Sequence, residues 1–436
     1  MTHSASDSER LLQVSDLARV EGEGSLRVVV RGGTVQEAAL NIFEPPRFFE
    51  ALLRGRRHDE APDITARVCG ICPVAYQMSA CAAVEQACGV VVSDPITALR
   101  RLLYCGEWIQ SHALHIYLLH APDFLGCQDA VGLAALDPNA VERGLRIKRT
   151  GNLLMETVGG RAIHPVNVRV GGFHRAPTRA EIQALRGPLQ VALEDAAATV
   201  EWVSRLDIPD LEADYLFVAL LGDQQYPIEA GRVGSSAGLD VSPEEFEPML
   251  VEEHEQRSTA LHARLRGRDR YLTGPLARYA LNRERLPEEV RRAAEAAGLG
   301  AVCRNPFQSI VVRAVELMYA CGEALRLVDS YQPPSPPAVP VPGRAGSGTG
   351  ATEAPRGLLL HHYELDDTGL IRVARLVPPT SQNQLAIEAD LRQVVQAGLE
   401  LSDADLTWRC EQTVRNYDPC ISCAAHFLDV TVERQR

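Results

Sequence analysis

The sequence has little that would suit it to a membrane or to a nucleic acid. It contains no run of roughly 18 apolar residues, so we expect no transmembrane helix. Its first residues, MTHSASDSER, lack the apolar stretch of a secretory signal peptide. The formal net charge of −13 disfavours nucleic-acid binding, which needs a concentrated positive surface. Arg54, Arg56 and Arg57 form only a short basic stretch, typical of a solvated or intersubunit surface.

The chain also lacks an internal repeat and a glycine-rich dinucleotide-binding fingerprint. Its composition, with 46% hydrophobic and 23% charged residues, is ordinary for a soluble globular protein. Residues 332–350 are rich in proline, glycine and serine, and we expect a surface loop there. Such a loop need not separate independently folding units, so we expect a single domain over residues 1–436.

Helix signals dominate the sequence. Pro73 suits a first helical position and Gly89 suits a helix end, so a helix is predicted between them. A second helix has a cap at Ser93 or Asp94, and its apolar spacing continues to Pro122. We therefore predict a mainly α, multihelical fold with small β elements. Further helices are expected within residues 179–204, 243–265, 286–297 and 308–328.

Two segments predict β structure. Residues 25–42 contain two apolar runs joined by a Gly-Gly pair, which indicates two N-terminal strands. Residues 358–377 predict a β-hairpin that turns at 366–369. Neighbouring strands lie about 4.8 Å apart, so the hairpin brings residue 356 opposite residue 379 or 380. Arg356 and Thr380 should therefore border the same small volume.

Two CxxC motifs, Cys69–Cys72 and Cys420–Cys423, carry the clearest chemical signal. In a chain without a secretory signal, 11 cysteines indicate a reducing compartment, where paired cysteines bind metals or do redox chemistry. Both pairs fall near an expected helix N-terminus, where the helix dipole favours thiolate. Four thiolates could hold a structural zinc ion, but pairs 351 positions apart (420 − 69) fit that class poorly. Cysteines without ligand spacing are expected in the core, as for Cys81, Cys88 and Cys105.

The C-terminal motif adds a histidine. Asp418 and Pro419 form a helix-start signature. The helix would place Cys420, Cys423 and His426 on one face, with His426 about 9 Å along the axis from Cys420. Metal–ligand bonds are only about 2.0–2.3 Å long. We therefore expect His426 to serve a second ion or a hydrogen bond.

Six motifs occur together along the chain: RVEGEGSL at 19–26, RVCGICPVAYQ at 67–77, SHALHIYLLHAPDF at 111–124, APRG at 354–357, PTSQN at 379–383 and DPCISCAAH at 418–426. In these motifs the chain resembles the large, catalytic subunit of nickel–iron hydrogenases. The resemblance implies that subunit's multihelical fold and reversible heterolytic oxidation of H2. The sequence CPVAYQ resembles that of the soluble, cytoplasmic branch of the family, which exchanges electrons with NAD(P). Two residues depart from the family pattern: Tyr76 replaces a histidine and Ser111 an aspartate of many respiratory members.

By this resemblance, the four motif cysteines are the thiolate ligands of a nickel–iron centre whose iron carries one CO and two cyanides. Cys69 and Cys420 would bind nickel terminally. Cys72 and Cys423 would bridge nickel to iron. Soft thiolates suit such metals.

The resemblance also assigns residues around the centre. Arg356 would be held over the metals, where its guanidinium polarises H2 and hydrogen-bonds a cyanide. Pro355 and Thr380 would contact the cyanides as well. Asp418 would pair with Arg356, in addition to its expected role as a helix cap.

Other polar residues near the motifs divide into functional and structural groups. Glu21 matches the glutamate that passes protons between the terminal nickel cysteine and the surface. Glu23 is the neighbouring alternative and is expected to be solvated. His112, His115 and His120 are expected to be structural groups rather than ligands.

A second metal site and a processed tail also follow from the resemblance. Glu50, the carbonyl of Leu376 and His426 would bind Mg2+ (or Fe2+), with waters completing about six ligands. Residues 427–436 would be a propeptide that a maturation protease removes after nickel is inserted, or would remain as an edge strand.

The chain has no further cysteine pattern for iron–sulfur clusters, so electrons must leave through partners. The resemblance implies an iron–sulfur small subunit, flavin- and NAD(P)-binding reductase subunits and a nickel chaperone. The alternatives are an H2-sensing regulatory subunit on the same scaffold, a structural zinc protein and a respiratory complex I subunit. The last is disfavoured because it lacks the four cysteines.

Overall fold

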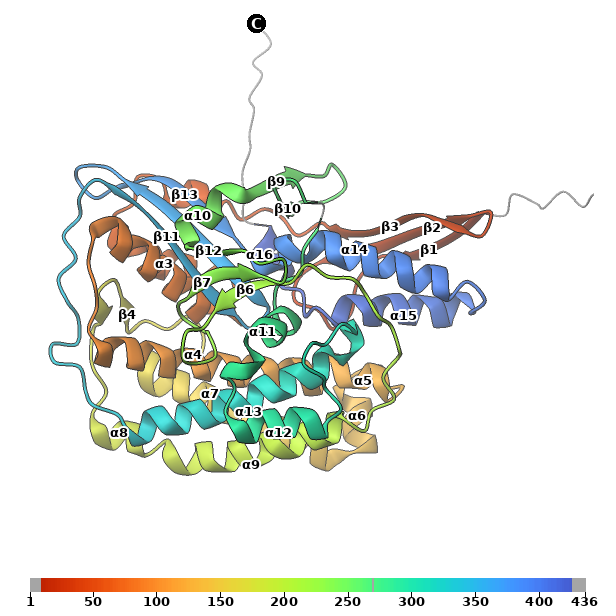
Figure 1. Cartoon of the computed structure of the whole chain (residues 1–436), viewed down its shortest axis with the longest axis horizontal. Helices are drawn as coiled ribbons and strands as arrows, with labels where there is room; N and C mark the ends of the chain where they lie inside the picture. Colours follow the sequence, from red (N-terminus) through yellow and green to blue (C-terminus); the bar gives the residue numbers. More distant parts are fainter. Residues whose placement is uncertain (1–8, 269, 426–436) are drawn as a thin grey trace, which may run out of the picture.

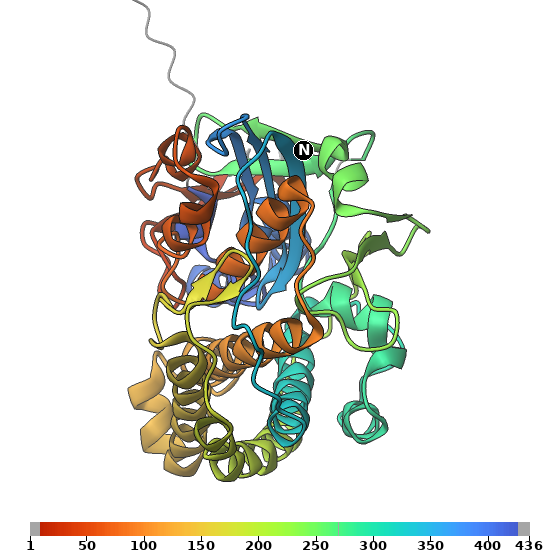
Figure 2. The same cartoon turned by 90° about the vertical axis from the view of Figure 1, so that its left-hand side faces the viewer.

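The computed structural model describes residues 9–268 and 270–425, and helices dominate it (Figures 1 and 2). The mainly α fold with small antiparallel sheets is confirmed. Long helices gather at the bottom of Figure 1, and α4 and α13 are buried over most of their length. These long helices are α4 (Asp94–Leu114), α7 (Pro138–Gly159), α9 (Arg186–Val203) and α13 (Ser309–Asp329).

Helix α3 (Pro73–Cys88) begins and ends where the sequence predicts. Gly89 caps it with a φ of 62°, a left-handed conformation that glycine adopts without strain. The second predicted helix is less regular, because α4 gives way to a π-helical turn over His115–His120. That turn directs two imidazoles inward. Nε2 of His115 lies 2.8 Å from the carbonyl oxygen of Arg415, and Nε2 of His120 lies 3.0 Å from Oδ1 of Asn416.

The helix predicted over residues 243–265 is wrong. Only α10 (Pro243–Phe246) and a short 3-10 turn are helical there, and β9 (Leu250–His254) pairs with β10 (Leu261–Leu265). Strand β10 packs against α14 (Pro379–Ala397). Pairing and packing thus override the helix propensity of this Glu-, Ala- and Leu-rich segment.

The loop predicted over residues 332–350 ends early, because β11 (Gly346–Ala354) already begins within it. Strand β11 lies directly on α3, and Figure 2 shows this helix against the sheet. A Cβ added at Gly346, Gly348 or Gly350 would overlap a backbone carbonyl oxygen of α3. The glycines therefore permit close packing of strand on helix, a role that their composition alone does not distinguish from a loop.

The predicted hairpin is present as β12 (Gly357–Leu365) and β13 (Ile371–Val377), with β11 on the other side of β12. Leu360 pairs with Val377, so Arg356 lies just beyond the paired region, as Thr380 does. The two predicted N-terminal strands are β2 (Gly24–Arg31) and β3 (Thr34–Ile42), and a further strand, β1 (Glu9–Val14), pairs with β2.

The remaining elements are short or peripheral, apart from α15. Over the described residues, no helix combines the length and apolar character needed to cross a bilayer. The remaining helices are α1 (Phe49–Leu53), α2 (Ala61–Thr65), α5 (Ala121–Phe124), α6 (Ala130–Leu136), α8 (Arg179–Gln183), α11 (Pro275–Asn282), α12 (Glu288–Ala296), α15 (Asp403–Arg415) and α16 (Ile421–Ala424). The remaining strands are β4 (Val168–Arg169), β5 (Gly172–Phe173), β6 (Val218–Leu221), β7 (Arg232–Ser235) and β8 (Asp240–Val241).

Candidate metal centre

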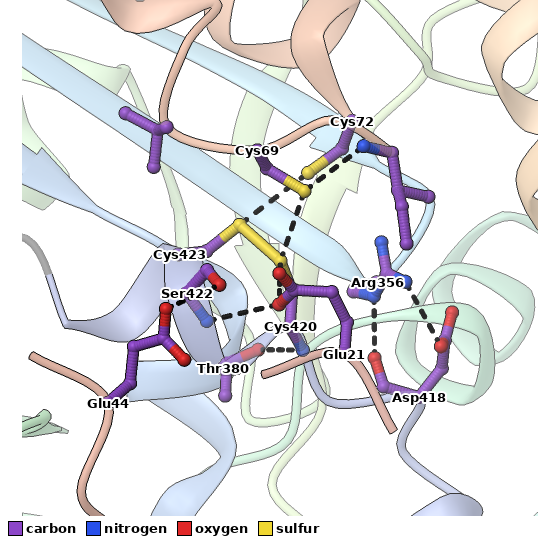
Figure 3. The surroundings of a disulfide bond; sticks show 12 residues. Glu21, Glu44, Cys69, Cys72, Arg356, Thr380, Asp418, Cys420, Ser422 and Cys423 are labelled. Carbon is purple, nitrogen blue, oxygen red and sulfur yellow. Dashed lines mark hydrogen bonds and ion pairs between the residues drawn. A yellow bond between two sulfur atoms is a disulfide. The ribbon is translucent and has the colours of Figure 1, made fainter. Parts of the chain in front are cut away.

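The four motif cysteines converge in the interior, although the two pairs are 351 positions apart. Their sulfurs all lie within 4.8 Å of one another, and all four residues are buried. The Sγ atoms of Cys72 and Cys423 are 3.6 Å apart, and those of Cys69 and Cys420 are 3.3 Å apart (Figure 3). Among the described residues, these four form the one group of three or more Cys, His, Asp or Glu side chains close enough together to bind a single metal ion.

Cys420 and Cys423 are joined by a disulfide in this structure (Figure 3). Thiolates rather than disulfide sulfurs bind metals, so the reduced pair is the metal-binding form. In the other cysteine pair, a side-chain hydrogen bond with Cys72 lowers the pKa of Cys69, although burial acts to raise it. Four soft, buried sulfur donors fit a transition-metal centre.

The predicted helix start at Asp418 is wrong. Helix α16 is a single turn over Ile421–Ala424, and its N-cap residue is Cys420 rather than Asp418. The backbone N–H groups that a cap would satisfy have other partners. Cys420 N–H donates to Oγ1 of Thr380 at 2.9 Å, and Ile421 N–H donates to the carbonyl of Glu21 at 2.9 Å.

Asp418 instead holds Arg356 beside the sulfurs. Nε of Arg356 donates to the Asp418 carbonyl at 2.7 Å, and Nη2 donates to Oδ1 of Asp418 at 3.1 Å. Figure 3 shows the third guanidinium nitrogen directed towards the cysteines. Burial disfavours the Arg356 cation, but Asp418, Cys72 and Cys69 outweigh this effect and raise its pKa. Arg356 thus contacts Asp418 and Thr380 contacts Cys420, so the two residues lie close together at the 418–420 segment, as the hairpin predicts.

Glu21 lies at the other edge of the sulfurs (Figure 3). Its Oε2 is 3.2 Å from Sγ of Cys420 and accepts the Ser422 N–H at 3.0 Å. The Ser422 hydroxyl in turn lies 3.2 Å from Oε1 of Glu44. Adjacent Gly22 has a φ of 92° and no room for a side chain, since a Cβ would lie 2.6 Å from Cβ of Ile421. A chain of polar groups thus runs outward from Cys420 to the partly buried Glu44.

The predicted magnesium ligands are only partly described. Oε1 of Glu50 accepts the Leu376 N–H at 2.7 Å, so this carboxylate lies beside the predicted carbonyl ligand. His426 lies outside the described residues, as does the predicted propeptide 427–436. Pro355 precedes Arg356 in the turn between β11 and β12, and its carbonyl accepts a hydrogen bond from Nη2 of Arg278 at 3.0 Å.

The sequence did not predict the residues that support this centre. Arg278 is fully buried, donates to the carbonyls of Ala354 and Pro355, and pairs with Glu316 and Glu353. It thereby anchors the backbone that leads to Arg356. No local sequence signal marks Arg278 as buried, because a charged residue in a helix is usually solvated.

A second support joins the Glu21 loop to the C-terminal motif. The Asp123 carboxylate accepts from Arg19 at 2.5 Å and from Arg415 at 2.7 and 2.8 Å. Nη1 of Arg415 also donates to the carbonyl of Ala18 at 3.0 Å. Because Arg19 precedes Glu21 by two residues and Arg415 precedes Cys420 by five, this cluster fixes the two segments relative to each other.

With this geometry in place, comparison with known proteins identifies the family. Residues 47–143 and 273–426, more than half of the chain, match the nickel-dependent hydrogenase family. The chain is 32% identical to sulfhydrogenase 1 subunit alpha of Pyrococcus furiosus, over 96% of this chain and 98% of that protein. It is 31% identical to sulfhydrogenase 2 subunit alpha of the same organism, over 96% and 99%.

Solved structures agree with this result. An NAD+-reducing [NiFe]-hydrogenase in the H2-reduced state superposes with a TM-score of 0.86 at 28% identity, covering 96% of this chain and 99% of that chain. The Ni-Fe-Se hydrogenase of D. vulgaris Hildenborough, at 21% identity and a TM-score of 0.79 over 96% and 100% of the two chains, shares the fold.

The chain belongs to the nickel-dependent hydrogenase family. It is the catalytic large subunit of a nickel–iron hydrogenase, which oxidises H2 or reduces protons. The four converging cysteines fit its nickel–iron centre.

Proposed function

We propose that the four cysteines hold the nickel–iron group with the roles that the family resemblance implies: Cys69 and Cys420 on nickel, Cys72 and Cys423 bridging to iron. The observation that carries this proposal is the burial of four sulfurs within 4.8 Å of one another, beside a buried arginine. When bound, the group would supply the Lewis-acidic site for heterolytic cleavage of H2. A structural zinc site would need neither a cation nor a carboxylate beside its sulfurs.

Glu21 then moves the proton. Its Oε2 lies 3.2 Å from Sγ of Cys420, within the reach that proton transfer needs. Glu21 accepts the backbone N–H of Ser422, whose hydroxyl lies 3.2 Å from Oε1 of Glu44, so Glu44 is the next carboxylate on the way to solvent. Arg356 supplies an oriented N–H group and a fixed positive charge over the sulfurs, and Asp418 holds its orientation. Pro355 and Thr380 would contact the cyanides, as the family resemblance implies.

Electrons would leave on the side of the centre where Gly70, the residue next to Cys69, reaches the surface. Gly70, directly after Cys69, is exposed, and Ile163 beside it is 57% exposed. A Cβ at Gly70 would lie 3.8 Å from Cγ2 of Ile163, so these residues form one surface. We assign it to the iron–sulfur small subunit, because an electron acceptor must approach the sulfur ligands and apolar surface favours stable docking.

Further partners and cofactors complete the proposal. The NAD+-reducing neighbour and the CPVAYQ wording support electron transfer to NAD(P) through flavin-containing reductase subunits in the cytoplasm. Glu50, the Leu376 carbonyl and His426 would bind Mg2+ or Fe2+. A nickel chaperone would load the site, and a maturation protease would then cut after His426.

Cys420→Ser tests the metal assignment, with Cys81→Ser as the matched control. Both cysteines are fully buried, but Cys81 lies on α3 away from the cluster. A hydroxyl is a poor ligand for these soft metals, so Cys420→Ser should lose nickel and H2 turnover together, while Cys81→Ser keeps both. Full nickel content and full turnover in Cys420→Ser would refute the assignment.

A further inference from the structure

Glu107 is a buried carboxylate with no part in the chemistry described above. It lies on α4 with no exposed surface. Oε2 accepts the Val74 N–H at 2.6 Å, and Oε1 accepts the Ala75 N–H at 3.1 Å. These N–H groups belong to the first turn of α3, directly after Cys72, whose side chain makes no capping hydrogen bond. A side chain from another helix therefore caps α3 at the metal-binding cysteine.

A neighbour on α4 holds the other flank of the same cysteine. Nε2 of Gln110, one turn after Glu107, donates to the carbonyl of Ile71 at 2.7 Å. The Ile71 N–H in turn lies 3.2 Å from Sγ of Cys69. Two side chains of α4 thus hydrogen-bond the backbone on either side of Cys72. Glu107 can carry a charge, whereas Gln110 is neutral.

The hydrogen-bond pattern indicates the charge of this acid. Both hydrogen bonds of the Glu107 carboxyl group come from N–H donors, whereas a carboxylic acid would need an acceptor for its own O–H. The N-terminus of a 16-residue helix also favours a negative charge. Burial raises the pKa of Glu107 well above its usual value, and the two N–H groups and Arg356 oppose that rise.

We propose that Glu107 is a positioning residue that fixes Cys72 and, in its ionised form, places a negative charge behind it, which sets the electron density and reduction potential of the centre. This inference rests on the assignment of Cys72 as a metal ligand. Buried charge and hydrogen bonding around sulfur ligands set the potential of metal–thiolate centres. A fixed negative charge stabilises the more oxidised state, so the charge lowers the potential.

The test compares three variants of the purified complex by redox titration monitored through the infrared bands of CO and cyanide. Glu107→Gln removes the charge, and the inference predicts a more positive midpoint potential and bands at higher wavenumber, with nickel retained. Glu107→Asp keeps the charge and should return both towards the parent. Gln110→Met loosens the same segment without a change in charge, so its band positions should stay parental.

Parental potential and band positions in Glu107→Gln would overturn the inference, because the carboxyl group would then be neutral. A shift of equal size in Gln110→Met would also overturn it, in favour of a purely structural role. If Glu107→Gln retains no nickel, Glu107→Asp decides: parental bands support the charge, and bands moved to higher wavenumber contradict it. Absence of CO and cyanide bands in the parent enzyme would instead refute the proposed centre.

Discussion

Replacement of Glu21 by glutamine isolates the proton step from the metal centre. The backbone carbonyl of Glu21 holds Ile421 at 2.9 Å, and this bond does not depend on the side chain. The glutamine oxygen can take the place of Oε2, which accepts the Ser422 N–H and also lies beside Sγ of Cys420. At most one buried hydrogen bond is lost, about 1 kcal/mol of stability, so the fold and the metals should remain.

The effect on catalysis should be far larger. A glutamine amide cannot take a proton from the cysteine 3.2 Å away or return it. Loss of a positioned general base typically costs about 10²–10⁴ in rate. H2/D2O exchange measures this step without electron transfer to partners, and it should fall by that factor in Glu21→Gln while the infrared bands stay parental. Glu23→Gln, an exposed carboxylate two residues away, is the matched control and should exchange normally. Parental exchange in Glu21→Gln, with the loss appearing in Glu23→Gln, would refute the assignment.

Three further predictions concern the charge over the metals, the packing beneath them and the tail. Arg356→Lys keeps the charge but loses the planar fork that holds Asp418, so H2 turnover should fall by about 10²–10³; near-normal turnover would contradict its role. Gly348→Ala forces a methyl group against the carbonyl of Ala83 and should destabilise the subunit by about 1–3 kcal/mol in chemical denaturation, and an unchanged midpoint would refute the close packing. Intact-mass measurement of the nickel-loaded enzyme should show loss of residues 427–436, and an active chain that keeps them would exclude cleavage.

The helices and the convergence of the two CxxC motifs could be predicted from the sequence because short residue patterns mark the helix ends and the cysteine motifs. Helix α3 follows from Pro73 and Gly89, and the convergence of Cys69 with Cys420 follows from two CxxC motifs that no nearby partner explains. The turn at 366–369 was sufficient to bring Arg356 and Thr380 to one place.

The failures share a physical cause, which is competition from distant segments. Asp418 does not cap a helix because Thr380 and Glu21 already take the N–H groups of Cys420 and Ile421. The glycines near residue 348 are strand residues because a helix backbone lies against them. Buried supports such as Glu107 and Arg278 carry no local signal, since a charged residue in a helix is usually solvated.

Infrared spectroscopy of the purified complex, combined with metal analysis of the same sample, tests the central claim most directly. The account predicts intrinsic CO and cyanide bands together with nickel and iron, and their joint loss in Cys420→Ser but not in Cys81→Ser. Zinc in place of nickel and iron, without such bands, would contradict it.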